Sequence, residues 1–184
     1  MRNFVKIAEG IDVAAIALAL NQHPELWDEH RERKSYDGTP HTQMQDIWLR
    51  FNDRANLQGD YAKFTDQHES VWYPAIDKLP QVRPLIFWLM SKVQATRLGG
   101  VLITKVRPGG RIAPHVDRGW HPEYYKVKLY VPIQSNPHCL NRCEEEWVSM
   151  STGDCWYFNN LVEHEVLNRG KDDRIMLIIC LRCD

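Results

Sequence analysis

The second half of the chain is a succession of short apolar runs separated by glycine, proline, asparagine and aspartate. The runs are rich in β-branched and aromatic residues, the composition typical of strands. Seven of them lie between residues 101 and 181, which leaves no room for the crossover helices of a parallel α/β sheet. The pattern therefore predicts an antiparallel β core of the sandwich, barrel or jelly-roll type. The predicted strands are 101–106, 111–117, 124–133, 146–150, 155–158, 163–168 and 174–181.

Two apolar stretches in the first half have the periodicity of helices. One covers residues 13–21, where the carboxylate of Asp12 can accept free amide hydrogens of the first turn. The other covers residues 82–96, and Gly99 and Gly100 are expected to stop it. We therefore expect helices to flank the β core.

The segment between these helices, residues 35–73, is polar and only weakly periodic, with one possible strand at 47–51. We expect a single domain over residues 1–184. In it, a helical and irregular part, 1–98, packs on a β core, 99–184. The expected class is mainly β with flanking N-terminal helices.

Composition narrows the classes of partner. The 184 residues carry 23 Lys and Arg against 24 Asp and Glu, a formal net charge of −1. This balance gives no electrostatic attraction for nucleic acid or an anionic membrane, and no apolar run is long enough for a membrane span. The five cysteines are odd in number and lie in the last quarter, unlike a secreted disulfide framework. We expect a soluble, cytoplasmic protein with reduced thiols that binds neither nucleic acid nor membrane; its oligomeric state is left open.

His115, Asp117 and His164 carry the candidate chemistry. A strand places residues two apart on one face, so the first two are expected to point inward from 111–117. His164 is expected to join them from 163–168. Two imidazoles and one carboxylate can occupy one face of an octahedral metal and leave three positions open, as in non-haem Fe(II) oxygenases.

Other pairs in the chain have similar chemistry, so the His-x-Asp spacing is a weak signal by itself. Proline separates the two residues in two of these pairs, and the third lies in a charged run. Proline disfavours a central strand at the two pairs that contain it, and no buried pocket is expected at the third. The pairs are His23 with Glu25, His30 with Glu32, and His121 with Glu123.

Arg174 strengthens the case for His115, Asp117 and His164. It opens the final apolar run, ten residues after His164. A buried arginine is costly unless it is paired, and its planar fork suits a carboxylate. A dicarboxylate that chelates iron at one end and meets Arg174 at the other fits 2-oxoglutarate. The alternative is an ordinary strand-edge arginine paired with Asp172 or Asp173.

Four short motifs follow one another between Gly99 and Leu181. They are a Pro-Gly turn, a Pro-His pair, a Gly-x4-Phe-Asn run, and a His-x-Val-x-Asn segment followed by arginine. Their residues are Pro108 and Gly109; Pro114 and His115; Gly153, Phe158 and Asn159; and His164, Val166, Asn168 and Arg174. Together they resemble the aspartyl/asparaginyl β-hydroxylase family of Fe(II)/2-oxoglutarate oxygenases. The resemblance implies a double-stranded β-helix, the jelly-roll fold of the cupins.

The resemblance also implies roles for single residues. The two histidines and Asp117 would bind Fe(II), and Arg174 would hold the distal carboxylate of 2-oxoglutarate. Lys128 and Tyr130, aligned on Pro132, would also face this cosubstrate. An enzyme of this kind consumes O2 and releases succinate and CO2 as it hydroxylates an unactivated C–H bond.

The substrate is less constrained. Vertebrate members of the family have glycine in place of the carboxylate ligand, whereas related small-molecule hydroxylases have aspartate, as this chain does at Asp117. We therefore expect hydroxylation of a small molecule such as an amino acid or derivative, with an Asp- or Asn-type peptide side chain as second choice. Substrate contacts are expected from the polar N-terminal segment, where a strand would turn Trp48, Arg50 and Asn52 to one face.

Two other functions remain open at this stage. A cupin-like metal-binding or sensing module without turnover would keep both histidines and the carboxylate but would not need Arg174. A zinc-stabilised interaction domain would use the cysteines, with His138 as a further ligand. Its thiols would be Cys139, Cys143, Cys180 and Cys183. We assign no role to His41 or His68.

Overall fold

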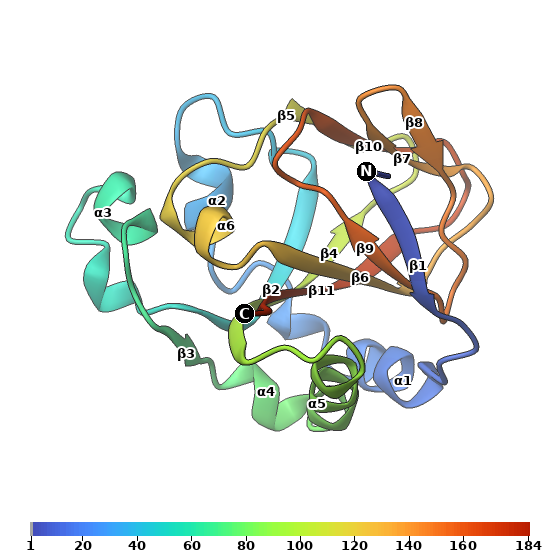
Figure 1. The fold of residues 1–184 in the computed structure, drawn as a ribbon, viewed down its shortest axis with the longest axis horizontal. Helices are drawn as coiled ribbons and strands as arrows, with labels where there is room; N and C mark the ends of the chain where they lie inside the picture. The colour runs from blue at the N-terminus through green and yellow to red at the C-terminus, as the bar shows by residue number, and fades with distance from the viewer. Residues whose placement is uncertain (1) are drawn as a thin grey trace.

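The structure is a computed structural model that describes residues 2–184, and it consists of two β-sheets flanked by helices (Figure 1). The strands are β1 (Phe4–Ala8), β2 (Met44–Asn52), β3 (Ser70–Trp72), β4 (Arg97–Val106), β5 (Arg111–His115), β6 (Val127–Gln134), β7 (Cys139–Cys143), β8 (Glu146–Val148), β9 (Cys155–Phe158), β10 (His164–Asn168) and β11 (Arg174–Arg182). The helices are α1 (Ala14–Gln22), α2 (Glu32–Ser35), α3 (Tyr61–Thr65), α4 (Ala75–Lys78), α5 (Val82–Lys92) and α6 (Trp120–Tyr124), with short 3-10 turns at Pro24–Leu26 and Arg54–Asn56. None of these helices is long and apolar enough to cross a membrane.

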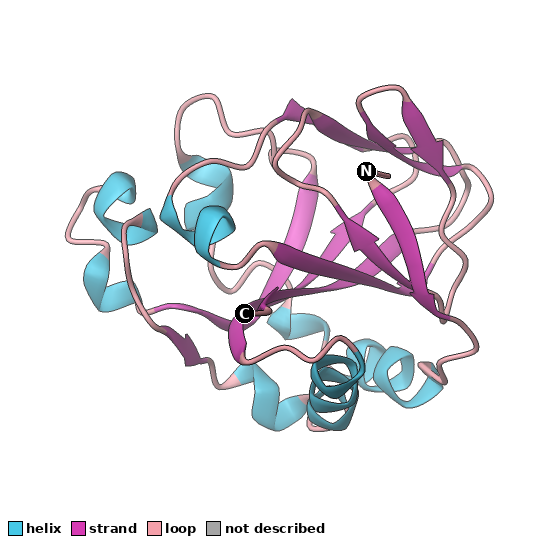
Figure 2. Ribbon diagram, viewed as in Figure 1, coloured by secondary structure: helices cyan, strands magenta, loops and turns pink. Residues whose placement is uncertain are grey.

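The two sheets face each other across the centre of the molecule. The larger has seven strands in the order β1-β9-β6-β11-β4-β2-β3, and the smaller has four in the order β5-β10-β7-β8. Paired strands run antiparallel throughout both sheets. Figure 2 shows α1, α4 and α5 on one side of the larger sheet and the smaller sheet on the other. This arrangement confirms the predicted mainly β class and the jelly-roll type of core.

Side chains that alternate along β11 belong to two hydrophobic cores, one on each face of the larger sheet. Leu177 and Ile179 point toward the helices and join the larger core, which also contains Leu89 of α5. Met176 and Ile178 point the other way, into the space between the sheets. Burying one such side chain stabilises the fold by about 1.5–3 kcal/mol. The space between the sheets is where the candidate site residues gather.

All seven predicted runs contain a strand, but the expected division of the chain at residue 98 is wrong. The N-terminal part supplies β1, β2 and β3 to the larger sheet, and only the middle of β2 was expected as a strand. β7 was also missed. Its sequence, CLNRC, has a buried polar position at Asn141 and contains neither β-branched nor aromatic residues.

The helices begin near the predicted positions and end differently. The Asp12 carboxylate accepts a hydrogen bond from the amide of Ala14 at 2.9 Å, as expected for the start of α1. α5 ends at Lys92, four residues before the predicted end, and Gly99 lies inside β4 instead of stopping a helix. A Cβ at Gly99 would lie 2.7 Å from the ring of Tyr125, so this glycine lets the ring lie against the strand.

Candidate functional site

His115 and His164 lie opposite each other on the adjacent strands β5 and β10. Their ring centroids are 4.1 Å apart. Asp117 follows two residues after β5 ends, so the prediction that both ligands lie within one strand is wrong. Its Oδ1 lies 3.4 Å from Nε2 of His115 and 3.8 Å from Nε2 of His164. The three candidate ligand atoms all lie within 4.8 Å of one another.

Backbone carbonyls orient both imidazoles. Nδ1 of His115 lies 2.8 Å from the carbonyl oxygen of Ala113, and Nδ1 of His164 lies 2.9 Å from that of Val162. A carbonyl only accepts, so each Nδ1 carries the hydrogen and each Nε2 presents a lone pair to the centre. Burial lowers the pKa of His164 to about 4, so this ring is neutral at pH 7. Such second contacts are typical of histidines that bind metals.

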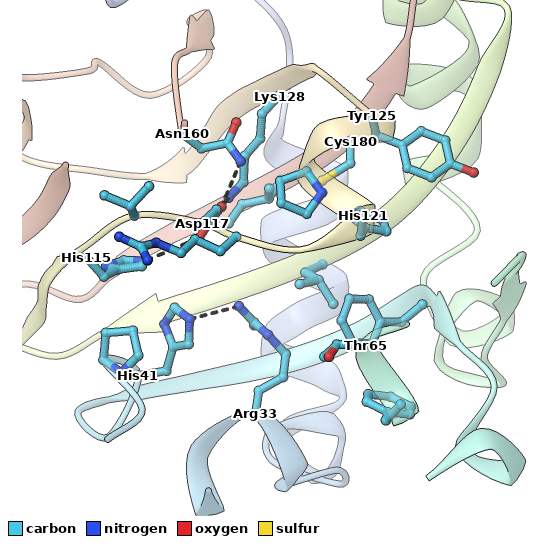
Figure 3. Close-up of a pocket in the computed structure, with 18 of the residues that line it drawn as sticks. Arg33, His41, Thr65, His115, Asp117, His121, Tyr125, Lys128, Asn160 and Cys180 are labelled. Carbon is cyan, nitrogen blue, oxygen red and sulfur yellow. Dashed lines mark hydrogen bonds and ion pairs between the residues drawn. The ribbon is translucent and has the colours of Figure 1, made fainter. Parts of the chain in front are cut away.

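The second oxygen of Asp117 is held by two donors (Figure 3). Oδ2 accepts hydrogen bonds from Nζ of Lys128 at 2.7 Å and from Nδ2 of Asn160 at 2.8 Å. Burial alone would raise the pKa of Asp117, but the positive charge of Lys128 and the hydrogen bond that Lys128 donates hold this pKa well below its usual range. The carboxylate is therefore anionic and offers Oδ1. Lys128 was predicted to face the cosubstrate, yet its ammonium lies on Asp117; Asn160 was not predicted, and nothing in its sequence context marks it.

Arg174 is a buried cation with one unpaired edge of its guanidinium, formed by Nε and Nη1 and called its free edge below. Its exposed fraction is 1%, and Nη2 donates to Oδ1 of Asn141 at 2.9 Å. Nε and Nη1 have no hydrogen-bond partner among the described residues. Among residues 2–184, Arg174 is paired with neither Asp172 nor Asp173, so the alternative of an ordinary strand-edge ion pair is wrong. A buried guanidinium is costly without an anion, so the free edge fits the carboxylate of a bound ligand.

Aromatic rings enclose the space near the histidines. Phe158 stacks on Tyr130 at 4.7 Å between ring centroids, and its ring meets that of His164 at 4.9 Å. The guanidinium of Arg174 lies 5.9 Å from the Tyr130 ring. Burial raises the pKa of Tyr130, which keeps its hydroxyl protonated. Tyr130 therefore lies beside both Arg174 and Phe158, and its predicted contact with 2-oxoglutarate stays a prediction.

A cavity of about 440 Å³ lies beside His115 and Asp117. Its other walls come from the larger sheet, through β2, β4, β6 and β11, and from α2, α3, α6 and the segment before β2. Figure 3 shows Arg33 and His41 on the side of the cavity facing His115 and Asp117. Rings make up much of the remaining lining, including Tyr36, Phe51, Tyr61, Phe64, His68 and His121. The volume is that of a small-molecule site.

Trp48, Arg50 and Asn52, predicted as substrate contacts, do not line this cavity. The pairing of β2 with β4 shifts register between Trp48 and Arg50, and this bulge ends the simple alternation of faces. Phe51 faces the cavity instead. Arg50 donates to the carbonyl of Leu98, while the amide oxygen of Asn52 accepts from a side chain in the next turn. The prediction of a shared face is therefore wrong.

The competing histidine and cysteine sets do not form metal sites within the described part of the chain. The one group of His, Cys, Asp and Glu side chains close enough to hold a metal is His115, Asp117 and His164. The thiols of Cys139 and Cys143 instead donate to oxygens of Asn168 and Asn159. His41 and His68, to which the sequence assigned no role, line the cavity, as does His121.

Comparisons with known proteins agree with this geometry. The family model described as Aspartyl/Asparaginyl beta-hydroxylase matches residues 20–182. No curated protein matches the chain.

Solved structures are similar at low sequence identity. The non-heme alpha-ketoglutarate-dependent carbocyclase SnoK from nogalamycin biosynthesis has a TM-score of 0.62 and 13% identity, covering 98% of this chain and 79% of its own. The viral collagen prolyl hydroxylase from Paramecium bursaria Chlorella virus-1 has a TM-score of 0.56 and 12% identity, covering 100% and 97%. A Pseudomonas putida prolyl-4-hydroxylase has a TM-score of 0.51 and 14% identity, covering 100% and 94%. At these identities the likeness concerns the fold, and it confirms the double-stranded β-helix.

Proposed function

The chain belongs to the aspartyl/asparaginyl β-hydroxylase family, and from this premise we propose that it hydroxylates an unactivated C–H bond of a small molecule, using Fe(II), 2-oxoglutarate and O2 and releasing succinate and CO2. One observation carries the proposal. The ligand atoms of His115, Asp117 and His164 lie within 4.8 Å of one another, in the two-histidine, one-carboxylate combination of non-haem iron sites.

The residues fit the groups that this chemistry needs. His115, Asp117 and His164 would hold Fe(II), and the free edge of Arg174 would hold the distal carboxylate of 2-oxoglutarate. When bound, the iron and 2-oxoglutarate supply the activation of O2 that C–H hydroxylation requires.

The chain itself contributes orientation and exclusion of water. The carbonyls of Ala113 and Val162 fix the two imidazoles, so that no reorganisation is needed when the metal binds. Lys128 and Asn160 occupy Oδ2 of Asp117, which restricts this carboxylate to a single metal-facing oxygen. Phe158 covers one side of His164 and keeps that side dry.

The cavity supports a small molecule as substrate, such as an amino acid or derivative. Its volume of about 440 Å³ is at the lower end of the range for small-molecule sites. A peptide side chain of the Asp or Asn type is the second candidate. A cupin-like metal-binding module without turnover remains the alternative from another class, but such a module has no use for the unpaired edge of Arg174.

Succinate formation tests the proposed function. Purified protein is incubated with Fe(II), ascorbate and 2-oxoglutarate in air, and succinate is measured with and without candidate substrates. We expect succinate from the unmodified protein and none from His164→Ala. Iron binding without any succinate, across a broad substrate panel, would instead support the module without turnover.

A further inference from the structure

Arg33 is a cation built into the wall of the cavity. It lies in α2, and its Nη1 lies 2.7 Å from Oδ2 of Asp46 on β2. The Asp46 side chain is 1% exposed, and that of Arg33 is 13% exposed. Asp46 does not line the cavity whereas Arg33 does. The Asp46 carboxylate therefore holds the Arg33 guanidinium on the side away from the cavity. The opposite side of the guanidinium faces the cavity.

His41 lies between Arg33 and the proposed iron site. Nη2 of Arg33 lies 3.5 Å from Nε2 of His41. A guanidinium only donates, so Nε2 accepts and the hydrogen of the neutral ring is on Nδ1. Nδ1 is buried and has no hydrogen-bond partner within residues 2–184. The His41 ring meets the His115 ring edge-on at 5.2 Å between centroids. An unused N–H donor is therefore present beside a proposed iron ligand.

The charges around the cavity leave one positive charge in excess. Arg33, Lys128 and the exposed Arg118 line it, against Asp117 in the lining and Asp46 behind it. Fe(II) and the dianion of 2-oxoglutarate together add no net charge, and Arg174, which would hold that dianion, adds a further positive charge. A negatively charged ligand would reduce this excess, whereas an amine would increase it. Guanidinium groups bind carboxylates through two parallel hydrogen bonds, which adds orientation as well as affinity.

We propose that the substrate is a small carboxylic acid whose carboxylate is bound by Arg33, with His41 donating a further hydrogen bond from Nδ1. This inference rests on the proposed function and names the substrate class of the same site. The carbon skeleton of the acid then lies along the apolar lining supplied by Phe51, Phe64 and Leu102. Arg33 and His41 contact the substrate directly and determine specificity, and neither belongs to the metal group.

The test compares matched acids and amides. Protein loaded anaerobically with Fe(II) and 2-oxoglutarate is titrated calorimetrically with a panel of linear, branched and aromatic carboxylic acids and amino acids, each beside its primary amide. At least one acid binds, and its amide binds about tenfold or more weakly, because a lost charge-assisted hydrogen bond has about that effect.

Variants identify the binding group. Arg33→Lys keeps a positive charge beside Asp46 but removes the planar guanidinium that can donate two parallel hydrogen bonds. His41→Leu removes the proposed Nδ1 donor. Each is expected to weaken binding of the acid about tenfold while iron and 2-oxoglutarate bind normally. Arg83→Lys is the matched control, because Arg83 lies on the outside of α5 and pairs with Asp77. If Arg33→Lys does not fold, His41→Leu still tests the site.

Three results would overturn the inference. They are amides or amines that bind as tightly as the acids, acids that bind equally to Arg33→Lys and His41→Leu, or a panel in which no acid binds. Failure of the unmodified protein to bind iron or 2-oxoglutarate is a different result, which rejects the proposed function itself.

Discussion

Within residues 2–184, two nitrogen atoms of Arg174 have no hydrogen-bond partner in the buried space between the sheets. Replacing it with methionine removes an unpaired buried charge, which favours the folded state, and leaves Oδ1 of Asn141 without its donor, which costs about 1–3 kcal/mol. We therefore expect Arg174→Met to change the stability of the metal-free protein little, unlike the loss of about 3–5 kcal/mol when a buried ion pair is broken.

The same substitution should abolish stabilisation by 2-oxoglutarate. Thermal unfolding of the metal-loaded protein, with and without 2-oxoglutarate, measures both effects together. An Arg174→Met protein that is still stabilised by 2-oxoglutarate would show that the cosubstrate carboxylate binds elsewhere.

Lys128 acts on the metal through Asp117. Oδ2 of Asp117 accepts hydrogen bonds from Lys128 and Asn160, and Lys128→Met removes the first of these. We expect the affinity for iron to fall about 10–100-fold, the usual effect of losing a partner of a metal ligand. Competition with a metal chelator measures this change, and Lys105→Met is the control because Lys105 lies over Trp27, outside the site. Equal iron affinity in both variants would contradict the role given to Lys128.

His121 makes the stability of the metal-free protein depend on pH. Burial lowers its pKa to about 3, whereas an unfolded histidine titrates near 6.5. Between these values the unfolded state binds more protons, so the free energy of unfolding decreases as the pH falls from about 6.5 toward 3. Urea unfolding from pH 7 to pH 4 should show this loss. His121→Gln should reduce the slope by up to about 1.4 kcal/mol per pH unit, and an unchanged slope would show that other groups cause it.

At the scale of elements, α5 stabilises the larger sheet through one face. Leu89 is fully buried there, while Phe87 on the same helix is 55% exposed. Leu89→Ala should lower the free energy of unfolding by about 2–5 kcal/mol, and Phe87→Ala should change it by about 0.5 kcal/mol or less. Chemical unfolding of the two variants measures this contrast. Similar losses in both would mean that the burial pattern of α5 is not as described.

Elements with a strong local pattern were the ones that the sequence predicted. The final strand, β11, is a continuous apolar run, and α5 has a clear apolar face. β1 has no such signal, because it is a short edge strand that pairs with β9, about 150 residues away in the chain. The bulge in β2 is likewise set by pairing with β4, so no local pattern could place Phe51 instead of Arg50 toward the cavity.

At the scale of the whole molecule, the candidate metal site could be predicted and the cavity could not. His115 and His164 belong to strands that were themselves predicted, so their meeting follows from the fold. Arg33 and His41 reach the site from an irregular segment with no recognisable period. Their significance depends on Asp46, whose buried carboxylate orients Arg33, and this is visible only in three dimensions.

The central claim is that His115, Asp117 and His164 hold an iron ion to which 2-oxoglutarate binds with the help of Arg174. The most direct test is an anaerobic titration of the Fe(II)-loaded protein with 2-oxoglutarate, followed by visible absorbance. We predict a new absorption band that saturates with 2-oxoglutarate, that is absent in His164→Ala, and that is retained in His23→Ala, since His23 pairs with Glu25 away from the site. No band in the unmodified protein, or an unchanged band in His164→Ala, would contradict the claim.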